Sequence, residues 1–167
     1  MTPLYTAAQN GHEAVVRALI ELGADVNKAL DGGWTPLLIA TCYGHETMVR
    51  ALIEADADVN KAVDDGATPV SIAAHNGQVA MVWALIELGA DVNKAMNDGT
   101  TPLIIAAQTG HEAVVRALLE ASATVNKADD EGMTPLFFAA QVGYEAVVRA
   151  LIEAGADINK ARQGMTA

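Results

Sequence analysis

Hydrophobic and polar positions along the chain repeat with a period of 33 residues. In the first period, the apolar residues between positions 12 and 22 recur at the 3.6-residue spacing of one helix face. They are Val15, Val16, Leu19 and Ile20. Glu13 and Arg17 fall on the opposite face as i, i+4 neighbours, a spacing that supports an ion pair on a helix surface. The pattern therefore predicts an amphipathic helix in the second half of each period.

A shorter helix is predicted at the start of each period, where a threonine precedes a proline. The threonine hydroxyl can cap a helix, and proline fits the first helical position. Gly44 ends this helix in the second period, and Gly23 occupies the left-handed position that ends the longer helix of the first period. An Asp-Gly pair such as Asp65-Gly66 then predicts a hairpin turn. The threonine–proline pairs are Thr2-Pro3, Thr35-Pro36, Thr68-Pro69, Thr101-Pro102 and Thr134-Pro135.

The period divides the chain into five consecutive units, with the last one trimmed by one residue in its final loop. The units are residues 2–34, 35–67, 68–100, 101–133 and 134–167. Each is expected to fold as a helix, a tight turn, an antiparallel helix and a projecting turn. One unit cannot bury its apolar face alone, whereas stacked units can. The sequence therefore predicts an all-α solenoid that forms a single domain over residues 1–167.

The repeated unit resembles the ankyrin repeat. The matching residues are Thr-Pro-Leu at 35–37, Gly-His at 44–45, Ala-Ala at 73–74, and Gly-Ala-Asp-Val-Asn at 23–27 and 89–93. The resemblance covers essentially the whole chain. It implies right-angled, L-shaped repeats stacked in a curved array, with hairpin turns that project as fingers from antiparallel helix pairs. It also implies that the protein is a protein–protein interaction module.

Two slots of the repeat depart from the family pattern. The histidine that usually follows Thr-Pro-Leu is replaced by Tyr5, Leu38, Ser71, Ile104 and Phe137. We therefore expect the hydrogen bond usual at that slot to be absent. The aspartate that usually opens the finger is replaced by Leu30, Val63 and Met96. We expect these turns to be held instead by Asp31, Asp64 or Asn97, one residue later, or to be held less tightly.

A third departure lies at the end of the longer helix, where glycine is replaced by Asp56 and Ser122. A residue other than glycine costs up to ~1 kcal/mol there if the left-handed conformation is kept. Such imperfect slots favour a natural array over an engineered repeat scaffold with no native partner, which is kept as an alternative. Because Met165–Ala167 repeat the start of a unit, we expect a segment of a longer array. It should be monomeric in dilute solution and able to associate end to end.

Charge and composition narrow the range of partners. The net charge is −11, so nucleic acid and anionic membranes are poor candidates. No apolar run is long enough to cross a bilayer, and the first residues do not resemble a signal peptide. Cys42 is the single cysteine and can form no internal disulfide. These features favour an intracellular protein in the cytoplasm, and the nucleus is also compatible.

No pattern of residues predicts catalysis or metal binding. His-Glu pairs at 12–13, 45–46 and 111–112 lack the second histidine of a zinc protease, because valine stands four residues after each histidine. The segment that starts at Asp56 begins like a calcium loop. It has Lys61 where that loop needs glycine and Ala67 where it needs glutamate. No phosphate-binding glycine motif occurs. We therefore expect a protein that is not an enzyme and that uses no cofactor or metal.

Two polar slots are interpreted as structural. The histidines at the start of the longer helices are expected to hydrogen-bond across to the next repeat. Asparagines recur at one slot, and turn stabilisation is the preferred explanation. They are Asn27, Asn60, Asn93, Asn126 and Asn159. The ankyrin resemblance adds the alternative that an asparaginyl hydroxylase modifies them.

Recognition is expected where residues vary while the frame stays fixed, at the finger tips and on the groove side of the shorter helices. By resemblance these positions form a concave face. The candidate residues are Asp31, Trp34, Cys42, Tyr43, Asp64, Asp65, His75, Asn76, Asn97, Asp98, Gln108, Thr109, Asp130, Glu131, Met133 and Gln141. The set contains six acids and no lysine or arginine. It predicts a basic protein or peptide partner, with an apolar anchor near Trp34 and Tyr43. In the alternative interpretation, the acids only form turns and keep the protein in solution.

A second candidate surface lies in the third unit. The charged pair of the longer helix is replaced there by Val79 and Trp83. Exposed apolar pairs can mark a contact surface, although Trp83 packed flat against its neighbours explains the pattern as well. Two alternatives to a recognition module remain at this stage. The array could be the regulatory module of a larger enzyme, or a spacer that binds nothing.

Overall fold

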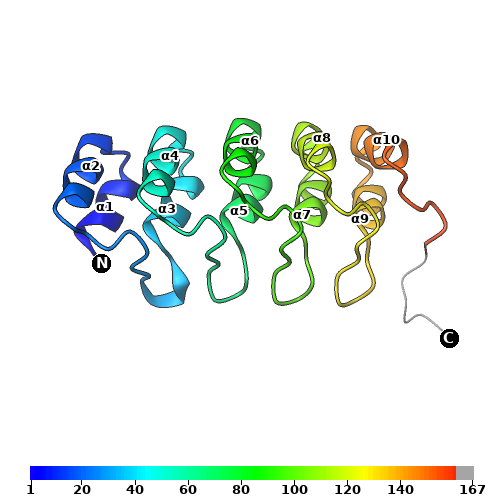
Figure 1. Ribbon diagram of the computed structural model, residues 1–167. Helices are drawn as coiled ribbons and strands as arrows, with labels where there is room; N and C mark the ends of the chain where they lie inside the picture. Colours follow the sequence, from blue (N-terminus) through cyan, green and yellow to red (C-terminus); the bar gives the residue numbers. More distant parts are fainter. Residues whose placement is uncertain (161–167) are drawn as a thin grey trace.

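The computed structural model describes residues 1–160 and shows ten α-helices arranged in five pairs (Figure 1). The shorter helices are α1 (Pro3–Gln9), α3 (Pro36–Cys42), α5 (Pro69–His75), α7 (Pro102–Thr109) and α9 (Pro135–Val142). The longer helices are α2 (Glu13–Glu21), α4 (Glu46–Glu54), α6 (Val79–Glu87), α8 (Glu112–Glu120) and α10 (Glu145–Glu153). A 3₁₀ turn, η1 (Asp31–Gly33), lies in the first finger. Residues 165–167, which repeat the start of a unit, lie outside the described residues.

Each shorter helix begins as the sequence predicts. The hydroxyl oxygen of Thr35 accepts a hydrogen bond from the backbone N–H of Leu38 at 3.3 Å, and Pro36 is the first helical residue. The threonines before α1, α5, α7 and α9 make the same bond. In the third pair the Ser71 hydroxyl also lies 3.0 Å from the Thr68 hydroxyl. Ser71 stands where the family usually has histidine, and we expected no hydrogen bond from that position. The bond is present in this repeat because serine also carries a polar group.

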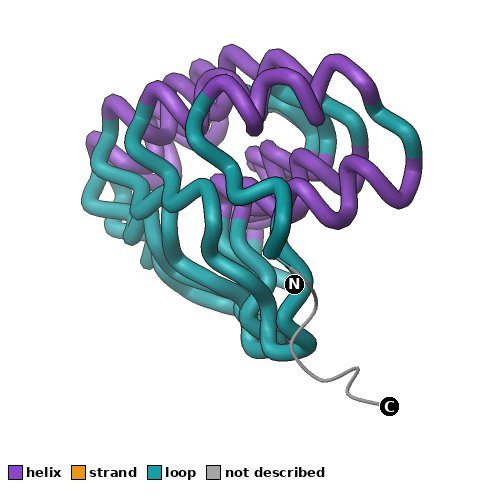
Figure 2. Tube along the Cα trace, turned by 90° about the vertical axis from the view of Figure 1, so that its right-hand side faces the viewer, coloured by secondary structure: helices purple, strands orange, loops and turns teal. Residues whose placement is uncertain are grey.

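The helix pairs stack side by side in chain order, with shorter helices packed on shorter helices and longer on longer. Seen along the stack, the fingers point away from the helix pairs at a steep angle, which gives each repeat an L shape (Figure 2). Within residues 1–160 there is no β-strand, so the fingers are turns without regular strands. The prediction of an all-α array of ankyrin-like repeats is confirmed.

The core runs the length of the stack between the two layers of helices. Leu37, Leu52, Leu85 and Leu118 are at most 1% exposed, and the alanine pairs of α5 and α7 are fully buried. Val15 was expected on the buried face of α2, yet it is 48% exposed. The same slot is buried in the other four repeats, where the preceding repeat covers it. Val15 belongs to the first helix pair and has no such neighbour.

A ladder of asparagine side chains joins successive repeats. The Asn27 side-chain amide donates to the backbone carbonyl of Asp56 at 3.0 Å and accepts from the N–H of Asp58 at 2.9 Å. Asn60, Asn93 and Asn126 make the same pair of bonds one repeat further along. The preferred explanation, a side-chain hydrogen bond that stabilises a turn, agrees with these bonds, but the loop that each asparagine holds belongs to the next repeat. They hold neighbouring repeats together.

The histidines at the start of the longer helices also connect repeats, in the direction opposite to the predicted one. Nε2 of His45 lies 3.1 Å from the backbone oxygen of Gln9, and Nε2 of His111 lies 3.0 Å from that of His75. Both acceptors belong to the preceding repeat. The acceptors, Gln9 and His75, are the last residues of α1 and α5. Each histidine therefore bonds the end of the shorter helix in the preceding repeat.

Two longer helices end in a strained backbone. Asp56 and Ser122 both have a φ of 67°, so each keeps the left-handed conformation without being glycine. We expect Ser122→Gly to raise the free energy of unfolding by up to about 1 kcal/mol, because glycine removes the clash of Cβ with the backbone. Urea denaturation followed by circular dichroism measures the change.

The neighbouring Ala121 provides a matched control. Its φ of −81° suits any residue, so Ala121→Gly only makes the unfolded chain more flexible and should lower stability. A loss of stability in both variants would contradict the explanation by strain.

Candidate protein-binding surface

The fingers position the predicted acidic residues through backbone hydrogen bonds. In the second finger, the N–H of Val63 donates to the carbonyl of Ala67 at 3.0 Å, and the N–H of Gly66 donates to that of Val63 at 2.9 Å. The other three fingers close in the same way. Successive tips are also joined, since the N–H of Asp64 donates to the carbonyl of Gly32 at 3.0 Å. The tips therefore form one continuous edge along the stack.

Aspartates hold three of the turns: Asp129 does so at the position usual in the family, and in the second and third fingers the position differs from the predicted one. The Asp65 carboxylate accepts from the N–H of Ala67, and the Asp98 carboxylate from that of Thr100, both at 2.9 Å. We expected Asp64 and Asn97 in this role, one residue earlier. The Asn97 side chain instead donates to the Asp64 carbonyl of the preceding finger at 2.8 Å. An aspartate can bond to the backbone two residues ahead, and this reach selects the later position.

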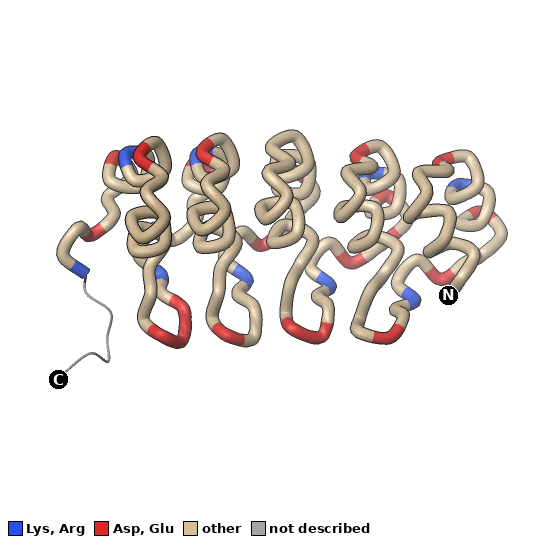
Figure 3. Tube along the Cα trace, turned by 180° about the vertical axis from the view of Figure 1, so that it is seen from behind, with Lys and Arg blue, Asp and Glu red and all other residues tan. Residues whose placement is uncertain are grey.

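The tips carry negative charge along the whole stack (Figure 3). All six predicted acids are exposed: Asp31, Asp64, Asp65, Asp98, Asp130 and Glu131. Hydrogen bonds from the Thr100 backbone and side chain lower the pKa of Asp98, which keeps this carboxylate charged. The lysines lie outside the tips, and Nζ of Lys94 donates to the Asn60 carbonyl at 2.7 Å. We call the four tips (residues 31–34, 64–67, 97–100 and 130–133), with the adjoining ends of α3, α5, α7 and α9, the finger surface.

An apolar cavity of about 340 Å³ lies in the middle of the finger surface. It brings together four residues of the predicted set: Trp34, Cys42, His75 and Asn76. Its remaining walls are Ala67, Ser71, Ile72, Met96 and Ile105. Ser71, Ile72, Met96 and Ile105 were not predicted, because they belong to slots that look like core positions in the sequence. The only signal in the sequence was the small size of Ala67 and Ser71 relative to their counterparts in other repeats.

Tyr43 does not line this cavity. It is 56% exposed, its ring stacks on that of His45 with centroids 6.2 Å apart, and its hydroxyl accepts from Nε2 of Gln9 at 3.4 Å. The structure thus places Trp34 and Tyr43 at separate points of the finger surface. Tyr5 lies near Tyr43 and Cys42, and burial together with these two groups raises the pKa of its hydroxyl.

The remaining candidates lie towards the C-terminal end of the surface. Gln108 is exposed near the end of α7, and the Thr109 hydroxyl donates to the carbonyl of Ile105 at 2.8 Å. The N–H of half-buried Met133 donates to the Asp129 carboxylate at 2.8 Å. Gln141 lines a cavity at the end of the stack.

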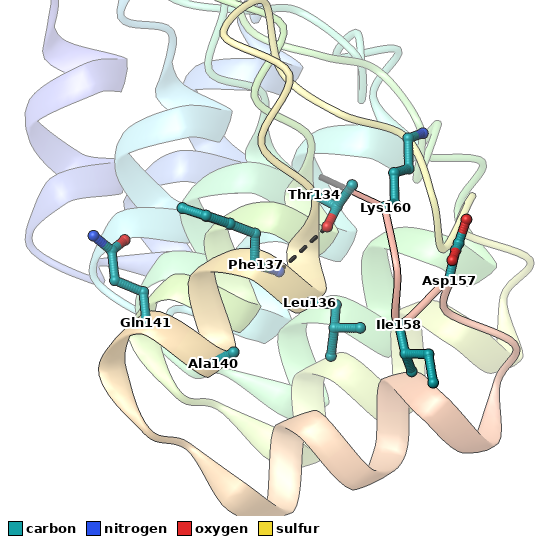
Figure 4. A pocket seen from close by; sticks show the side chains of 8 residues that line it. All are labelled: Thr134, Leu136, Phe137, Ala140, Gln141, Asp157, Ile158 and Lys160. Carbon is teal, nitrogen blue, oxygen red and sulfur yellow. Dashed lines mark hydrogen bonds between the residues drawn. The ribbon is translucent and has the colours of Figure 1, made fainter. Parts of the chain in front are cut away.

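That second cavity, of about 460 Å³, lies beside α9 (Figure 4). Leu136, which faces Ile158, and Phe137, which points towards the side of Gln141, supply its apolar walls, and Asp157 and Lys160 also line it. In the fourth repeat the residues equivalent to Leu136 and Phe137 are 1% exposed, because the fifth repeat covers them. The cavity is therefore the repeat-stacking face of the last described pair. End-to-end association of copies stays a prediction.

The second candidate surface interrupts a pattern of ion pairs on the longer helices. Arg50 pairs with Glu46 at 3.3 Å in its own helix and with Glu87 of the next repeat at 3.2 Å. Arg116 makes the corresponding pairs in the fourth and fifth repeats. In the third repeat Val79 and Trp83 replace such a pair, and both are half-buried against the core. A role in contacting a partner stays a prediction.

Other kinds of site were sought across residues 1–160. In that part of the chain no group of three or more His, Cys, Asp or Glu side chains could hold a metal ion. No helix there is both long and apolar enough to cross a membrane.

The stacked helix pairs, capped by Thr-Pro and joined by asparagine ladders, define a helical repeat protein. A family model described as ankyrin repeats (3 copies) matches residues 1–63 and 70–162. The chain belongs to the ankyrin repeat family, whose domains generally bind other proteins and are typically non-catalytic. No curated protein sequence matches the chain.

Proposed function

We propose that this protein is a non-catalytic recognition module that binds a basic protein partner through its finger surface. One observation carries the proposal: six exposed acids gather on the joined finger tips, where no lysine or arginine stands. Such a field attracts cationic surfaces and repels acidic ones. Trp34, half-buried in the apolar cavity, and the exposed Tyr43 offer aromatic contact area. The single cysteine, Cys42, fits an intracellular setting.

The test compares two variants that each remove three negative charges. Asp31→Asn/Asp64→Asn/Asp130→Asn changes the finger tips, and Glu13→Gln/Glu112→Gln/Glu145→Gln changes the longer helices. We expect the finger variant to bind octa-arginine about tenfold more weakly at physiological salt, since each charge pair contributes up to about 1 kcal/mol. The helix variant should bind almost as well as the wild type, because salt screens charges more than about 10 Å away. Isothermal titration calorimetry measures both affinities.

Equal losses in the two variants would mean that only the net charge matters, and would contradict the proposed surface. Capture from a cell lysate with the wild type and with Trp34→Ala/Tyr43→Ala then identifies the natural partner. Retention of that partner by the aromatic variant would overturn the anchor role.

The pH dependence follows from Asp98. Because its pKa is lowered in the folded protein, its carboxylate stays charged to below its ordinary range, which is near 3.9. The contribution of Asp98 to octa-arginine binding should therefore persist from neutral pH down to about pH 4, and disappear as the pH falls through its lowered pKa. The hydrogen bond to Thr100 contributes stability above the unfolded-state pKa, and this contribution disappears over the same acid range. Asp98→Asn should remove this part of the acid sensitivity.

A further inference from the structure

The cavity in the finger surface exists because two slots hold unusually small residues. Ala67 ends the second finger at the slot that Trp34, Thr100 and Met133 occupy in the other fingers. Ser71 stands in α5 at a slot filled elsewhere by larger residues, namely Tyr5, Leu38, Ile104 and Phe137. Both small residues line the same cavity. The end of the second repeat and the start of the third therefore lack side-chain volume at two adjoining positions.

The walls of this cavity suit an apolar group. Trp34, Ile72, Met96 and Ile105 supply aromatic and aliphatic surface from the first, third and fourth repeats. Two polar side chains of the wall are paired within the protein. The Ser71 hydroxyl is paired with that of Thr68, and Asn76 donates to the Cys42 carbonyl at 3.2 Å. The cavity has a volume of about 340 Å³, which is near the lower end of the ~300–1,000 Å³ range of small-ligand pockets. It accommodates one side chain and its surroundings rather than a whole helix.

The same fingers that form the walls carry negative charge. The N–H of Ala67 is held by the Asp65 carboxylate at 2.9 Å, so the wall residue and the acid share one turn. Met96 directly precedes Asn97, whose side chain is bonded to the Asp64 carbonyl. An apolar side chain in this cavity thus lies beside the acids of two fingers. Its neighbours in the partner's sequence would meet negative charge on either side.

We propose that the cavity takes one aliphatic side chain, of leucine size, from an extended segment of the partner in which lysine or arginine flanks that residue. This inference rests on the proposed function and specifies its partner. The acids attract the segment, and the cavity selects the central residue. Ala67 and Ser71 determine specificity, because a larger residue at either slot fills the space.

The probes are two synthetic peptides, Arg-Arg-Leu-Arg-Arg and Arg-Arg-Ala-Arg-Arg, which carry the same charge. We expect the wild-type protein to bind the leucine peptide at least about tenfold more tightly, because each buried methylene stabilises the complex. Ala67→Met should abolish this preference, because the larger side chain fills the space that the leucine side chain would enter. The variant should fold, since Met133 occupies the same slot in the fourth finger. Ser71→Leu, which introduces the residue that Leu38 provides in the second repeat, should act in the same way.

Ala113→Met provides a matched control, because Ala113 is exposed on α8 in the layer of longer helices. It should keep the leucine preference. Alkylation of Cys42, the single cysteine and a wall of the cavity, gives an independent measurement. The leucine peptide should slow the reaction of its thiol with iodoacetamide more than the alanine peptide does at equal saturation.

The possible outcomes distinguish selection by the cavity from binding by the acidic finger tips. If both peptides bind with equal affinity and Ala67→Met changes nothing, the cavity inference fails while binding by the acidic tips stands. If neither peptide binds, and octa-arginine does not bind either, both proposals are overturned. A leucine preference that Ala67→Met and Ser71→Leu remove, and that Ala113→Met keeps, supports the inference.

Discussion

Leu85→Ala is expected to lower the free energy of unfolding by about 3–5 kcal/mol, the largest effect among the predicted variants. Leu85 lies in α6 at the centre of the stack and is fully buried. Truncation removes its transfer free energy and leaves a cavity that the packed helices of the neighbouring repeats close only in part. Urea denaturation followed by circular dichroism measures the loss.

Leu19 occupies the same slot in the first repeat and serves as the control. It is half-buried and lines a surface cavity at the start of the stack. Leu19→Ala should therefore cost only about 1–2 kcal/mol, because less apolar surface returns to water. Equal losses at the two positions would show that burial by neighbouring repeats does not set the stability of each repeat.

Gly66→Ala is expected to cost about 3–4 kcal/mol and to disturb the finger tips. Gly66 has a φ of +94°, and a Cβ on it would lie 2.7 Å from the backbone nitrogen of Asn97 in the next finger. The neighbouring backbone would have to move, and the hydrogen bond from the Asn97 N–H to the Asp65 carbonyl, 3.0 Å long, would be lost. The expected cost therefore adds a steric displacement and a lost bond to the strain of the left-handed conformation.

Gly89 isolates the backbone contribution. Its φ of +93° matches that of Gly66, but a Cβ there would meet no atom within 4 Å. Gly89→Ala should cost about 1–2 kcal/mol, from the left-handed conformation alone. The difference between the two alanine variants in urea denaturation measures the close approach of neighbouring fingers. If the two variants lose the same stability, the close contact between neighbouring fingers does not contribute to the cost of Gly66→Ala.

The helices and their order could be predicted from the sequence because their causes are local. Thr35 and Pro36 specify the start of a helix by a hydrogen bond and a fixed dihedral angle within four residues. Apolar spacing specifies which face of each longer helix is buried, and the 33-residue period requires that neighbours bury it. The acids at the finger tips were found in the same way, because turns favour aspartate and expose it.

Several features depended on the neighbouring repeat and escaped prediction. The exposure of Val15, the bonds of Asn27 to the next repeat and the direction of the His45 bond are set by which repeat lies on which side. The turn-holding role of Asp65 depends on the geometry of a closed finger. The contacts between repeats join residues about thirty positions apart, a distance over which a local pattern carries no information.

The sequence by itself thus determined the repeat, its helices and the sign of its surface charge. Only the tertiary structure decided where space remains between the repeats. Ala67 and Ser71 are four residues apart in the chain, and each looks like an ordinary small residue. They open a cavity because Trp34 from one repeat and Ile105 from another pack around the same point. The cavity is the part of the space between neighbouring repeats that their side chains leave unfilled. It therefore exists only once the repeats are stacked.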